Sequence, residues 1–494
     1  MTDTDLDVLI VGAGLSGIGA AVHLQRNCPR ERWAIVEGRD AIGGTWDLFR
    51  YPGVRSDSDM YTLGYRFKPW TAAKAIADGP SILSYINETA TEHEITSRIR
   101  FGQKVTTADW DSGLARWTVT TTAKDGTATR LKARFLFMCS GYYNYTEGYR
   151  PTWPGETEFV GQIVHPQFWP EALDYSGKRV VVIGSGATAV TLVPAMAKQA
   201  AHVTMLQRTP TWIGAGPSSD AIANLLRAVL PSQVAYDLTR WKNITFSQWF
   251  YKQTRANPAK VRSALLGRLA KLLPADYDIA THFTPSYNPW DQRLCLVPDG
   301  DLFAAITAGT ASITTDTIER FEASGIRLAS GKLLEADIIV TATGLKLQSF
   351  GGMAVTVDGE VRRTADTLAY KGMMFSGIPN LAQSFGYINA SWTLRSDLIA
   401  DYVCRLLNHM RKTGVDIATP TPAPDVTPAR LAMDLQSGYV QRGADAQPRA
   451  GNRAPWLVTA DYKYDRRELL EGPVTDEMLF ARAHEAAPIL QAAE

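Results

Sequence analysis

The sequence predicts an α/β protein with two Rossmann-like dinucleotide-binding domains and a helical insertion in the second. Two observations predict this fold. A glycine-rich loop follows a buried strand close to the N-terminus, and a second loop of the same kind follows another buried strand near residue 184. In addition, a chain of 494 residues is too long for one typical domain, so two or three are expected.

The composition is that of an ordinary globular protein, with 45% hydrophobic and 20% charged residues. The formal net charge is +1 and there is no basic tail, which argues against a nucleic-acid partner. The acidic N-terminus lacks the features of a signal peptide, and no apolar run reaches the roughly 20 residues of a transmembrane segment. We therefore expect a cytoplasmic protein without a transmembrane segment.

The four cysteines are scattered along the chain and form no CxxC pair. This spacing excludes a redox-dithiol flavoprotein and a cysteine zinc site. No metal is therefore expected, and each cysteine is predicted to be a small buried residue. The four are Cys28, Cys139, Cys295 and Cys404.

The first glycine loop follows an apolar strand at residues 8–11 and opens a helix. Gly12 permits the tight turn, Gly14 allows a pyrophosphate to approach the backbone, and Gly17 allows the helix to pack on the strand. The N-terminus of that helix, which includes Ser16, offers N–H donors to phosphates. The second strand, at residues 33–36, ends in Glu37, whose carboxylate would bind ribose hydroxyls and repel a 2′-phosphate. FAD has no 2′-phosphate, so this loop is predicted to bind FAD.

The second glycine loop follows the strand at residues 179–183 and differs from the first at the end of its second strand. That strand, at residues 203–207, ends in Arg208 and Thr209 rather than in an acid. An arginine here can form a bidentate pair with a ribose 2′-phosphate, so this loop is predicted to bind NADPH. The candidate NADP-binding residues in the loop itself are Gly184, Ser185, Gly186, Ala187, Thr188 and Ala189.

The two loops suggest a domain division. We predict a first part of the FAD domain at residues 1–150, the NADP domain at 151–340, and a second part of the FAD domain with a C-terminal segment at 341–494. Amphipathic helical patterns at about 218–280 predict the insertion, covering the cleft or associating weakly with a membrane surface. The proline-rich stretch 419–428 predicts an exposed loop.

Two further motifs carry a resemblance to a known family. Residues 159–170 (FVGQIVHPQFWP) fit FxGxxxHxxxWP, and residues 44–57 (GTWDLFRYPGVRSD) fit GxWxxxxYPGxxxD. The chain thus resembles the type I Baeyer–Villiger monooxygenases, which are class B flavoprotein monooxygenases, with the closest likeness to their ethionamide-activating branch. Related N- and S-oxygenating enzymes end the first motif in Tyr or Phe, so Trp169 favours the Baeyer–Villiger branch.

The resemblance implies catalytic roles for Arg293 and Asp57. The reaction needs an anionic oxygen species in a dry site, and an arginine stabilises that anion without donating a proton. Asp57 would orient the guanidinium. Trp46 would form a flat apolar wall for the flavin, and the backbone of Val105 would meet the adenine edge. The resemblance also places the following residues at the cofactor: Gly44, Thr45, Asp47, Leu48, Arg55, Ser56 and Asp57.

The implied activity uses NADPH and O2 to convert a ketone into an ester or lactone, with thioethers and thioamides as further substrates. Two alternatives remain open: an N- or S-oxygenating monooxygenase without ketone activity, and an uncoupled NADPH oxidase or redox-sensing flavoprotein. The substrate pocket is expected between the 212–290 insertion and residues 386–395. His165 is expected at the domain hinge, and Trp456 in a loop that contributes to NADP binding. Gln292 stands where the family commonly has lysine.

Overall fold

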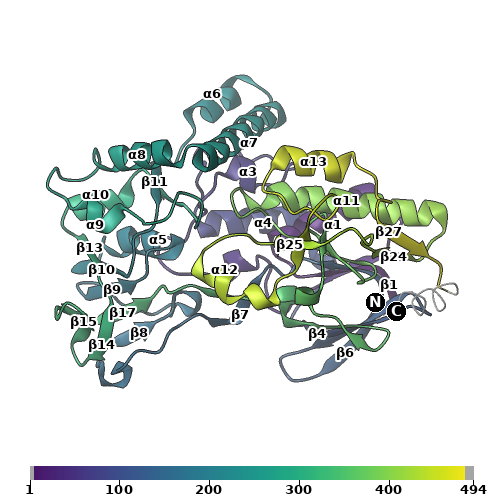
Figure 1. The fold of residues 1–494 in the computed structure, drawn as a ribbon, viewed down its shortest axis with the longest axis horizontal. Coiled ribbons are helices and arrows are strands. Elements are labelled where there is room, and N and C mark those ends of the chain that lie inside the picture. Colours follow the sequence, from purple (N-terminus) through teal and green to yellow (C-terminus); the bar gives the residue numbers. More distant parts are fainter. Residues whose placement is uncertain (1–4, 484–494) are drawn as a thin grey trace.

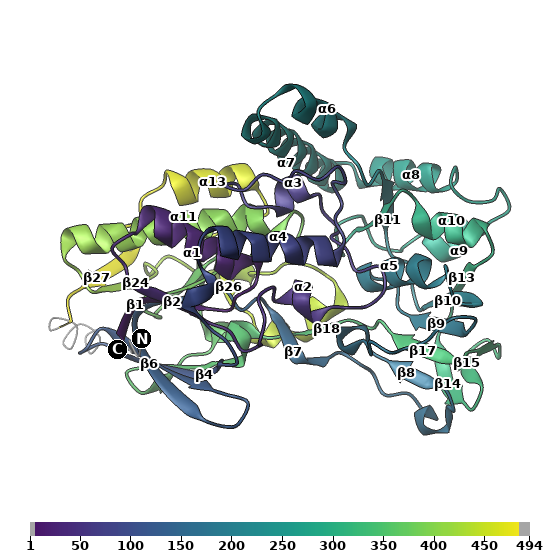
Figure 2. The ribbon, with the colours of Figure 1, turned by 180° about the vertical axis from the view of Figure 1, so that it is seen from behind.

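The structure is a computed structural model that describes residues 5–483. Two α/β domains lie side by side, the first on the right and the second on the left of Figure 1. A helical hairpin stands above them at the upper edge in both views (Figures 1 and 2). The predicted fold class is confirmed, because each domain is built on a sheet whose central strands are parallel.

The first domain is centred on a nine-stranded sheet with the order β20-β19-β4-β5-β6-β1-β2-β3, in which β23 also pairs with β6. Layers of side chains cover the central strands on both faces, which explains their nearly continuous apolar sequences. The strands are β1 (Asp5–Val11), β2 (Trp33–Val36), β3 (Ile99–Arg100), β4 (Lys104–Asp111), β5 (Arg116–Thr122), β6 (Ala128–Met138), β19 (Ala354–Val357), β20 (Glu360–Val361) and β23 (Leu381–Gln383).

One face of this sheet is covered by two long helices that pack against each other, α1 (Leu15–Asn27) and α11 (Trp392–Thr413). They come from opposite ends of the chain, so the domain closes only when residues after 341 return to it. Further helices complete the layer, as Figure 2 shows. These are α2 (Thr45–Leu48), α3 (Met60–Leu63), α4 (Gly79–Glu92) and α13 (Tyr462–Leu470).

The second domain has a five-stranded parallel sheet with the order β13-β10-β9-β17-β8. The helices α5 (Ala187–Met196) and α10 (Asp301–Thr307) pack on it, and a three-stranded antiparallel sheet lies beside it. The strands are β8 (Gln162–Val164), β9 (Arg179–Ile183), β10 (His202–Gln207), β11 (Ile213–Gly216), β12 (Cys295–Pro298), β13 (Ala311–Thr315), β14 (Ile318–Glu322), β15 (Gly325–Leu328), β16 (Leu333–Glu335) and β17 (Ile338–Thr341).

The chain passes between the domains through two paired strands, β7 (Tyr143–Gly148) and β18 (Leu345–Leu347), which run antiparallel. The segment after β18 adds small sheets and one short helix to the first domain. These elements are β21 (Ala369–Tyr370), β22 (Met374–Phe375), β24 (Ile417–Pro420), β25 (Pro428–Leu431), α12 (Gly438–Arg442), β26 (Arg449–Gly451) and β27 (Met478–Ala481).

The predicted insertion forms four helices. It belongs to the second domain by sequence, but it is anchored on the first domain. The guanidinium of Arg240 is buried and donates to the carbonyls of Tyr61 at 2.8 Å and Gly64 at 2.9 Å, and the hydroxyl of Tyr236 donates to the carbonyl of Tyr65. The insertion therefore bridges the two domains. Its helices are α6 (Ala221–Val229), α7 (Ser232–Ala256), α8 (Pro258–Leu269) and α9 (Ile279–Phe283).

The prediction of an exposed loop at residues 419–428 is partly wrong. Thr419 and Pro420 belong to the buried strand β24, which pairs with β27, so the exposed loop begins only after them. Composition misled here because Pro420 stands at the end of its strand, where proline is tolerated. The four cysteines are all free and buried, as predicted.

Candidate functional site

The first glycine loop, at residues 12–17, has a geometry that only glycine allows at two positions. Gly12 has φ +105°, and a Cβ there would lie 2.7 Å from the carbonyl oxygen of Cys139. A Cβ on Gly17 would lie 1.8 Å from the carbonyl oxygen of Gly12. The following helix α1 has no side-chain cap, so its first N–H groups are free to face a phosphate. The loop therefore fits the pyrophosphate of a dinucleotide.

Glu37 is buried directly beside this loop. Its carboxylate accepts hydrogen bonds from the backbone N–H of Ala13 at 2.7 Å and of Arg39 at 2.8 Å. Burial raises the pKa of Glu37, and these two N–H donors oppose that rise. Each oxygen keeps a second lone pair for a ribose hydroxyl. Val105 lies nearby, because Gln103 donates its backbone N–H to the carbonyl of Glu37 at the start of β4.

The second glycine loop, at residues 184–189, resembles the first but is open. Gly184 has φ +129°, and a Cβ there would lie 2.4 Å from the carbonyl oxygen of Ala342. A Cβ on Gly186, by contrast, meets no described atom within 4 Å. Ala189 is fully buried where α5 packs on the sheet. Arg208 is exposed and has no ion pair within residues 5–483, so its guanidinium remains available to a phosphate.

Ser185 connects this loop to the strand end beyond Arg208. Its hydroxyl lies 2.8 Å from the hydroxyl of Thr211 and donates to the carbonyl of Thr209 at 3.2 Å. The hydroxyl of Thr188 is hydrogen-bonded to Tyr51, a residue of the first domain. The predicted NADP-binding residues therefore lie together, and one of them reaches across to the other domain.

The loop at residues 44–57 docks the first domain on the second. A Cβ on Gly53 would lie 2.7 Å from the Cβ of Ala195 in α5, so only glycine fits between loop and helix. Arg55 forms an ion pair with Asp301 of α10 at 2.5 Å. The observed partner of Arg55 is thus a carboxylate across the interface. The close contact of Gly53 with α5 explains why the Tyr-Pro-Gly motif requires its glycine.

The other residues of this loop occupy distinct positions. Asp47 is buried and pairs with Arg39 and, at 2.9 Å, with Arg50, so its carboxylate fixes the loop. Thr45 has its hydroxyl 3.1 Å from that of Tyr145. Trp46 and Leu48 are half-buried, and Trp46 packs against the core of the first domain. Ser56 is buried and donates its hydroxyl to the carbonyl of Ser58 at 2.7 Å, and Gly44 lies against Gly14 of the first loop.

Arg293 and Asp57 meet at the interface between the domains. Two guanidinium nitrogens of Arg293, Nε and Nη2, donate to the same carboxylate oxygen of Asp57 at 2.8 and 2.6 Å. This carboxylate raises the pKa of Arg293 above its ordinary value, so the guanidinium stays charged. The predicted pair is therefore present, and it leaves the outer Nη1 side of the guanidinium for another partner.

An aromatic wall separates this pair from the first glycine loop. The ring of Tyr142 stacks on Trp392 at 5.1 Å, and the indole N–H of Trp392 donates to the hydroxyl of Ser16 at 2.7 Å. Tyr142 and Tyr143 have their hydroxyls 2.6 Å apart. Burial raises the pKa of both tyrosines, which keeps them neutral beside Arg293. The sequence analysis gave no role to the two tyrosines, whereas Trp392 lies in the segment 386–395 that was expected to line the substrate pocket.

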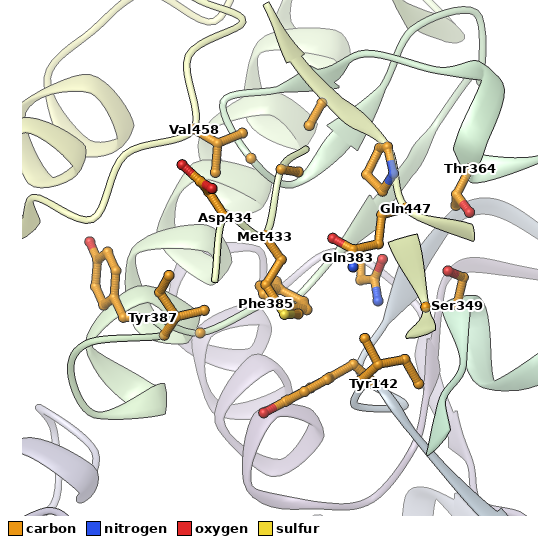
Figure 3. A pocket seen from close by; sticks show the side chains of 18 of the residues that line it. Tyr142, Ser349, Thr364, Gln383, Phe385, Tyr387, Met433, Asp434, Gln447 and Val458 are labelled. Atoms are coloured by element: carbon orange, nitrogen blue, oxygen red, sulfur yellow. The ribbon is translucent and has the colours of Figure 1, made fainter. Parts of the chain in front are cut away.

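A cavity of about 160 Å³ adjoins this wall (Figure 3). Tyr142, Phe385 and Met433 point into it, and Gln383 and Gln447 lie on its other side. Of the segments expected to line a substrate pocket, residues 386–395 line this cavity, whereas the insertion contributes only Tyr251. Most of the remaining wall comes from residues 430–460, which sequence reasoning missed because this segment carries no motif.

His165 lies at the linker strands, as expected. A Cβ on Gly148 of β7 would lie 2.2 Å from Cε1 of His165, so the imidazole ring rests directly on that strand. Burial lowers the pKa of His165, and its Nδ1 accepts the backbone N–H of Gln167 at 3.2 Å. The histidine is therefore a neutral packing element of the linker.

Trp456 does not occupy the position expected for it. It is fully buried against Tyr370, with ring centroids 5.3 Å apart, and its indole N–H donates to Glu477. A tryptophan held in the core cannot contact NADP from a surface loop, so that expectation is wrong. Among the described residues, no cluster of potential metal ligands is present and no helix is long and apolar enough to cross a bilayer.

Two dinucleotide-type loops that face one interface, with an arginine–aspartate pair between them, define a two-domain flavoprotein oxidoreductase. Comparisons with known proteins specify the family. The profile described as "Flavin-binding monooxygenase-like" matches residues 76–353, and the "NAD(P)-binding Rossmann-like domain" profile matches residues 10–72. The chain belongs to the flavin-binding monooxygenase-like family, which confirms that it is a monooxygenase.

Curated relatives match over nearly the whole chain. An FAD-containing monooxygenase EthA from Mycobacterium tuberculosis is 54% identical over 476 residues, covering 96% of this chain and 97% of that relative. A probable FAD-binding monooxygenase AlmA from Acinetobacter sp is 48% identical over 480 residues, covering 97% and 96%. The predicted resemblance to the ethionamide-activating branch is thus confirmed at the level of family.

Solved structures share the fold at lower identity. An oxidised steroid monooxygenase bound to NADP superposes with a TM-score of 0.74 at 23% identity, covering 97% of this chain and 100% of that one. An open cyclohexanone monooxygenase has a TM-score of 0.75 at 18% identity, covering 96% and 99%. The predicted cofactors, FAD and NADPH, agree with these proteins and with the FAD-containing relatives.

Proposed function

We propose that this enzyme is a Baeyer–Villiger monooxygenase that uses FAD, NADPH and O2 to convert ketones into esters or lactones, and that it also oxidises thioethers and thioamides at sulfur. The observation that carries this proposal is the guanidinium of Arg293, held by Asp57 at 2.6 Å where the two domains meet. FAD bound at the first loop and reduced by NADPH supplies the activated oxygen.

Arg293 provides what this reaction needs from the protein. Oxygen insertion into a ketone proceeds through negatively charged oxygen, and a permanent cation stabilises that charge best where water is excluded. Asp57 fixes the orientation of the guanidinium and leaves the other side of it for the carbonyl oxygen of the substrate. Tyr142 and Tyr143 remain neutral and so add no negative charge that would compete for the guanidinium.

The residues around the two loops suit FAD and NADPH. Gly12 and Gly17 let a pyrophosphate and a helix N-terminus come close together, and Glu37 accepts hydrogen bonds from a ribose without a 2′-phosphate. Arg208 at the second loop offers a guanidinium to the 2′-phosphate of NADPH. Because NADH lacks the 2′-phosphate, the guanidinium of Arg208 favours NADPH over NADH.

The cavity beside Tyr142 supports an apolar carbonyl or sulfur compound as substrate. Phe385, Met433 and Val458 give it apolar walls, and Gln383 and Gln447 add hydrogen-bonding groups. Apolar walls with a few polar groups are typical of small-molecule sites. The cavity shares Tyr142 with the wall next to Arg293, which supports a substrate position on the side of the cation.

The test is substitution of Arg293 in the FAD-loaded protein. Arg293→Ala is expected to lower ester formation by at least about a hundredfold, as removal of an oxyanion-stabilising group usually does, while NADPH is still oxidised and hydrogen peroxide appears. Arg293→Lys keeps the charge but loses the two-nitrogen grip on Asp57, and should retain a small part of the activity. The matched control is Arg327→Ala, which removes the ion pair of Arg327 with Glu322 at 2.9 Å in the antiparallel sheet of β14 and β15.

Ester formation that survives in Arg293→Ala would contradict the proposal. Two alternatives have distinct outcomes in the same assay. A sulfoxide from thioethers with no ester from any ketone would identify an N- or S-oxygenating enzyme. Stoichiometric hydrogen peroxide with no oxygenated product in the unaltered protein would identify an uncoupled NADPH oxidase.

A further inference from the structure

The helical hairpin α6–α7 exposes a large apolar surface. Exposed large hydrophobic side chains occur singly elsewhere in the described chain, but here eight of them share one hairpin. Trp241 is 67% exposed and Trp249 is 54% exposed, so more than half of each of these large residues is in contact with solvent. We call this surface the outer face: Ile222, Leu225, Val229, Val234, Leu238, Trp241, Phe246 and Trp249.

The outer face follows the helical period, so it is a continuous stripe and not a scatter. On α6, positions 222, 225 and 229 repeat at intervals of three and four, and on α7 positions 234, 238 and 241 do the same, with 249 about two turns further along and Phe246 beside this row. Only Ala223 of α6 is buried. Contiguous exposed apolar surfaces of this kind mark sites of interaction with another protein or a membrane.

The inner face of the hairpin is already occupied, so the outer face is not unfinished core. Arg240 and Tyr236 of α7 are buried and bonded to backbone carbonyls of the first domain. Lys242 pairs with Asp220 at 2.5 Å and ties α7 to the start of α6. The hairpin is therefore anchored on the first domain and projects from the upper edge of the molecule (Figures 1 and 2).

Charge distinguishes the possible occupants. Residues 218–280 contain nine Lys and Arg but four Asp, a formal charge of +5, whereas the whole chain carries +1 and the rest therefore carries −4. Next to the hairpin at the same edge, Lys260, Arg268 and Lys271 are exposed and have no ion pair within residues 5–483. One acid, Asp237, lies exposed on α7 and opposes this charge.

We propose that the outer face docks on the surface of an anionic phospholipid bilayer, with the Trp and Phe rings in the interface and the cations of α8 facing the headgroups. Tryptophan, phenylalanine and leucine on one face with nearby lysine and arginine are the composition of helices that lie in a membrane interface. A second copy of this chain would bring two positively charged surfaces together, which is unfavourable. The docking is reversible, because one hairpin buries little area compared with a spanning helix.

The test is cosedimentation of the full-length, FAD-loaded protein with vesicles of phosphatidylcholine alone or mixed with phosphatidylglycerol. We expect binding to the mixed vesicles, weakened by salt, and little binding to phosphatidylcholine alone. A triple variant with Leu225→Ser, Trp241→Ser and Trp249→Ser should bind at least about tenfold more weakly. Asp237→Lys should bind more tightly, by about fivefold for each unit of charge changed.

The matched control alters three exposed apolar residues outside the hairpin. Leu114→Ser, Val160→Ser and Val361→Ser remove side chains of similar exposure from the body of the molecule, and should leave vesicle binding unchanged. NADPH oxidation in solution should be the same for both triple variants, so this test is independent of the proposed reaction.

Three outcomes would overturn the proposal. The first is no binding to anionic vesicles. The second is equal loss of binding in both triple variants, or binding that ignores phosphatidylglycerol and salt. The third is a dimer in sedimentation velocity that disappears in the Leu225, Trp241 and Trp249 variant without any vesicle binding, which would assign the outer face to a second copy of the chain.

Discussion

The two glycine loops differ in how much of the protein surrounds them. The first is closed in by Cys139, Gly43 and Gly44, and the acid beside it, Glu37, is buried. In the second loop, Gly186 has open space next to it and Arg208 is exposed. Similar sequences on similar βα turns thus produce an enclosed site and an open one.

This difference matches two kinds of nucleotide use. A cofactor that is re-used in every cycle gains from an enclosed site, since each protein contact that must break before release slows its loss. A nucleotide that must leave after each reduction needs an open one. We therefore expect FAD to stay bound through many cycles and NADP to exchange.

The largest expected effect comes from adding a single methyl group to a glycine in each loop. Gly17→Ala places a Cβ 1.8 Å from the carbonyl oxygen of Gly12, so the helix and strand must move apart and FAD should be lost with much of the fold. Gly186→Ala meets no atom, so FAD content and Tm should be unchanged and only the KM for NADPH should rise. FAD absorbance per protein and thermal melting measure both. Equal loss of FAD in the two variants would remove the distinction.

The second expected effect tests nucleotide choice at the open loop. Arg208→Ala should raise the KM for NADPH roughly tenfold to a hundredfold, because a charged hydrogen bond contributes about 1.5–3 kcal/mol, while the KM for NADH stays the same. Steady-state kinetics with both nucleotides provide the internal control. If NADH and NADPH were affected equally, Arg208 would not contact the 2′-phosphate.

The smallest expected effect concerns stability and pH. Burial tends to lower the pKa of His23 in α1, but Asp397 and Asp401 of α11 outweigh this and raise it to about 9. Because the folded pKa exceeds the ordinary value of 6.5, the stabilisation is complete below pH 6.5 and is lost as pH rises through 9. The advantage in Tm of the unaltered protein over His23→Gln should therefore be present near neutral pH and vanish above pH 9.

His282 in the second domain is the matched control for this experiment. Burial lowers its pKa, so it is already neutral in the alkaline range and contributes no proton there. The Tm of His282→Gln should follow that of the unaltered protein between pH 7 and 9.5. If His23→Gln did the same, the ion pairs between α1 and α11 would not contribute to stability.

The parts of the structure that were predictable from sequence are those with local causes. Gly12, Gly17 and Glu37 lie within one βαβ unit, so their spacing alone places them together. Arg293 and Asp57 were found through motifs, although 236 residues separate them. The anchoring of Arg240 on the first domain and the cavity wall from residues 430–460 depend on long-range packing, which leaves no periodic signal in the sequence. The ion pair of Arg55 with Asp301 also joins residues that are far apart in the sequence, and no sequence pattern predicts it.

The central claim, that the enclosed flavin site and the arginine at the interface insert oxygen into a ketone, is tested most directly by turnover under oxygen-18 gas. The FAD-loaded protein would be incubated with NADPH and a panel of linear and cyclic ketones, and the products examined by mass spectrometry. We predict an ester or lactone that contains one labelled oxygen atom for each NADPH consumed. An unlabelled product, or consumption of NADPH with the ketone recovered unchanged across the panel, would contradict the account.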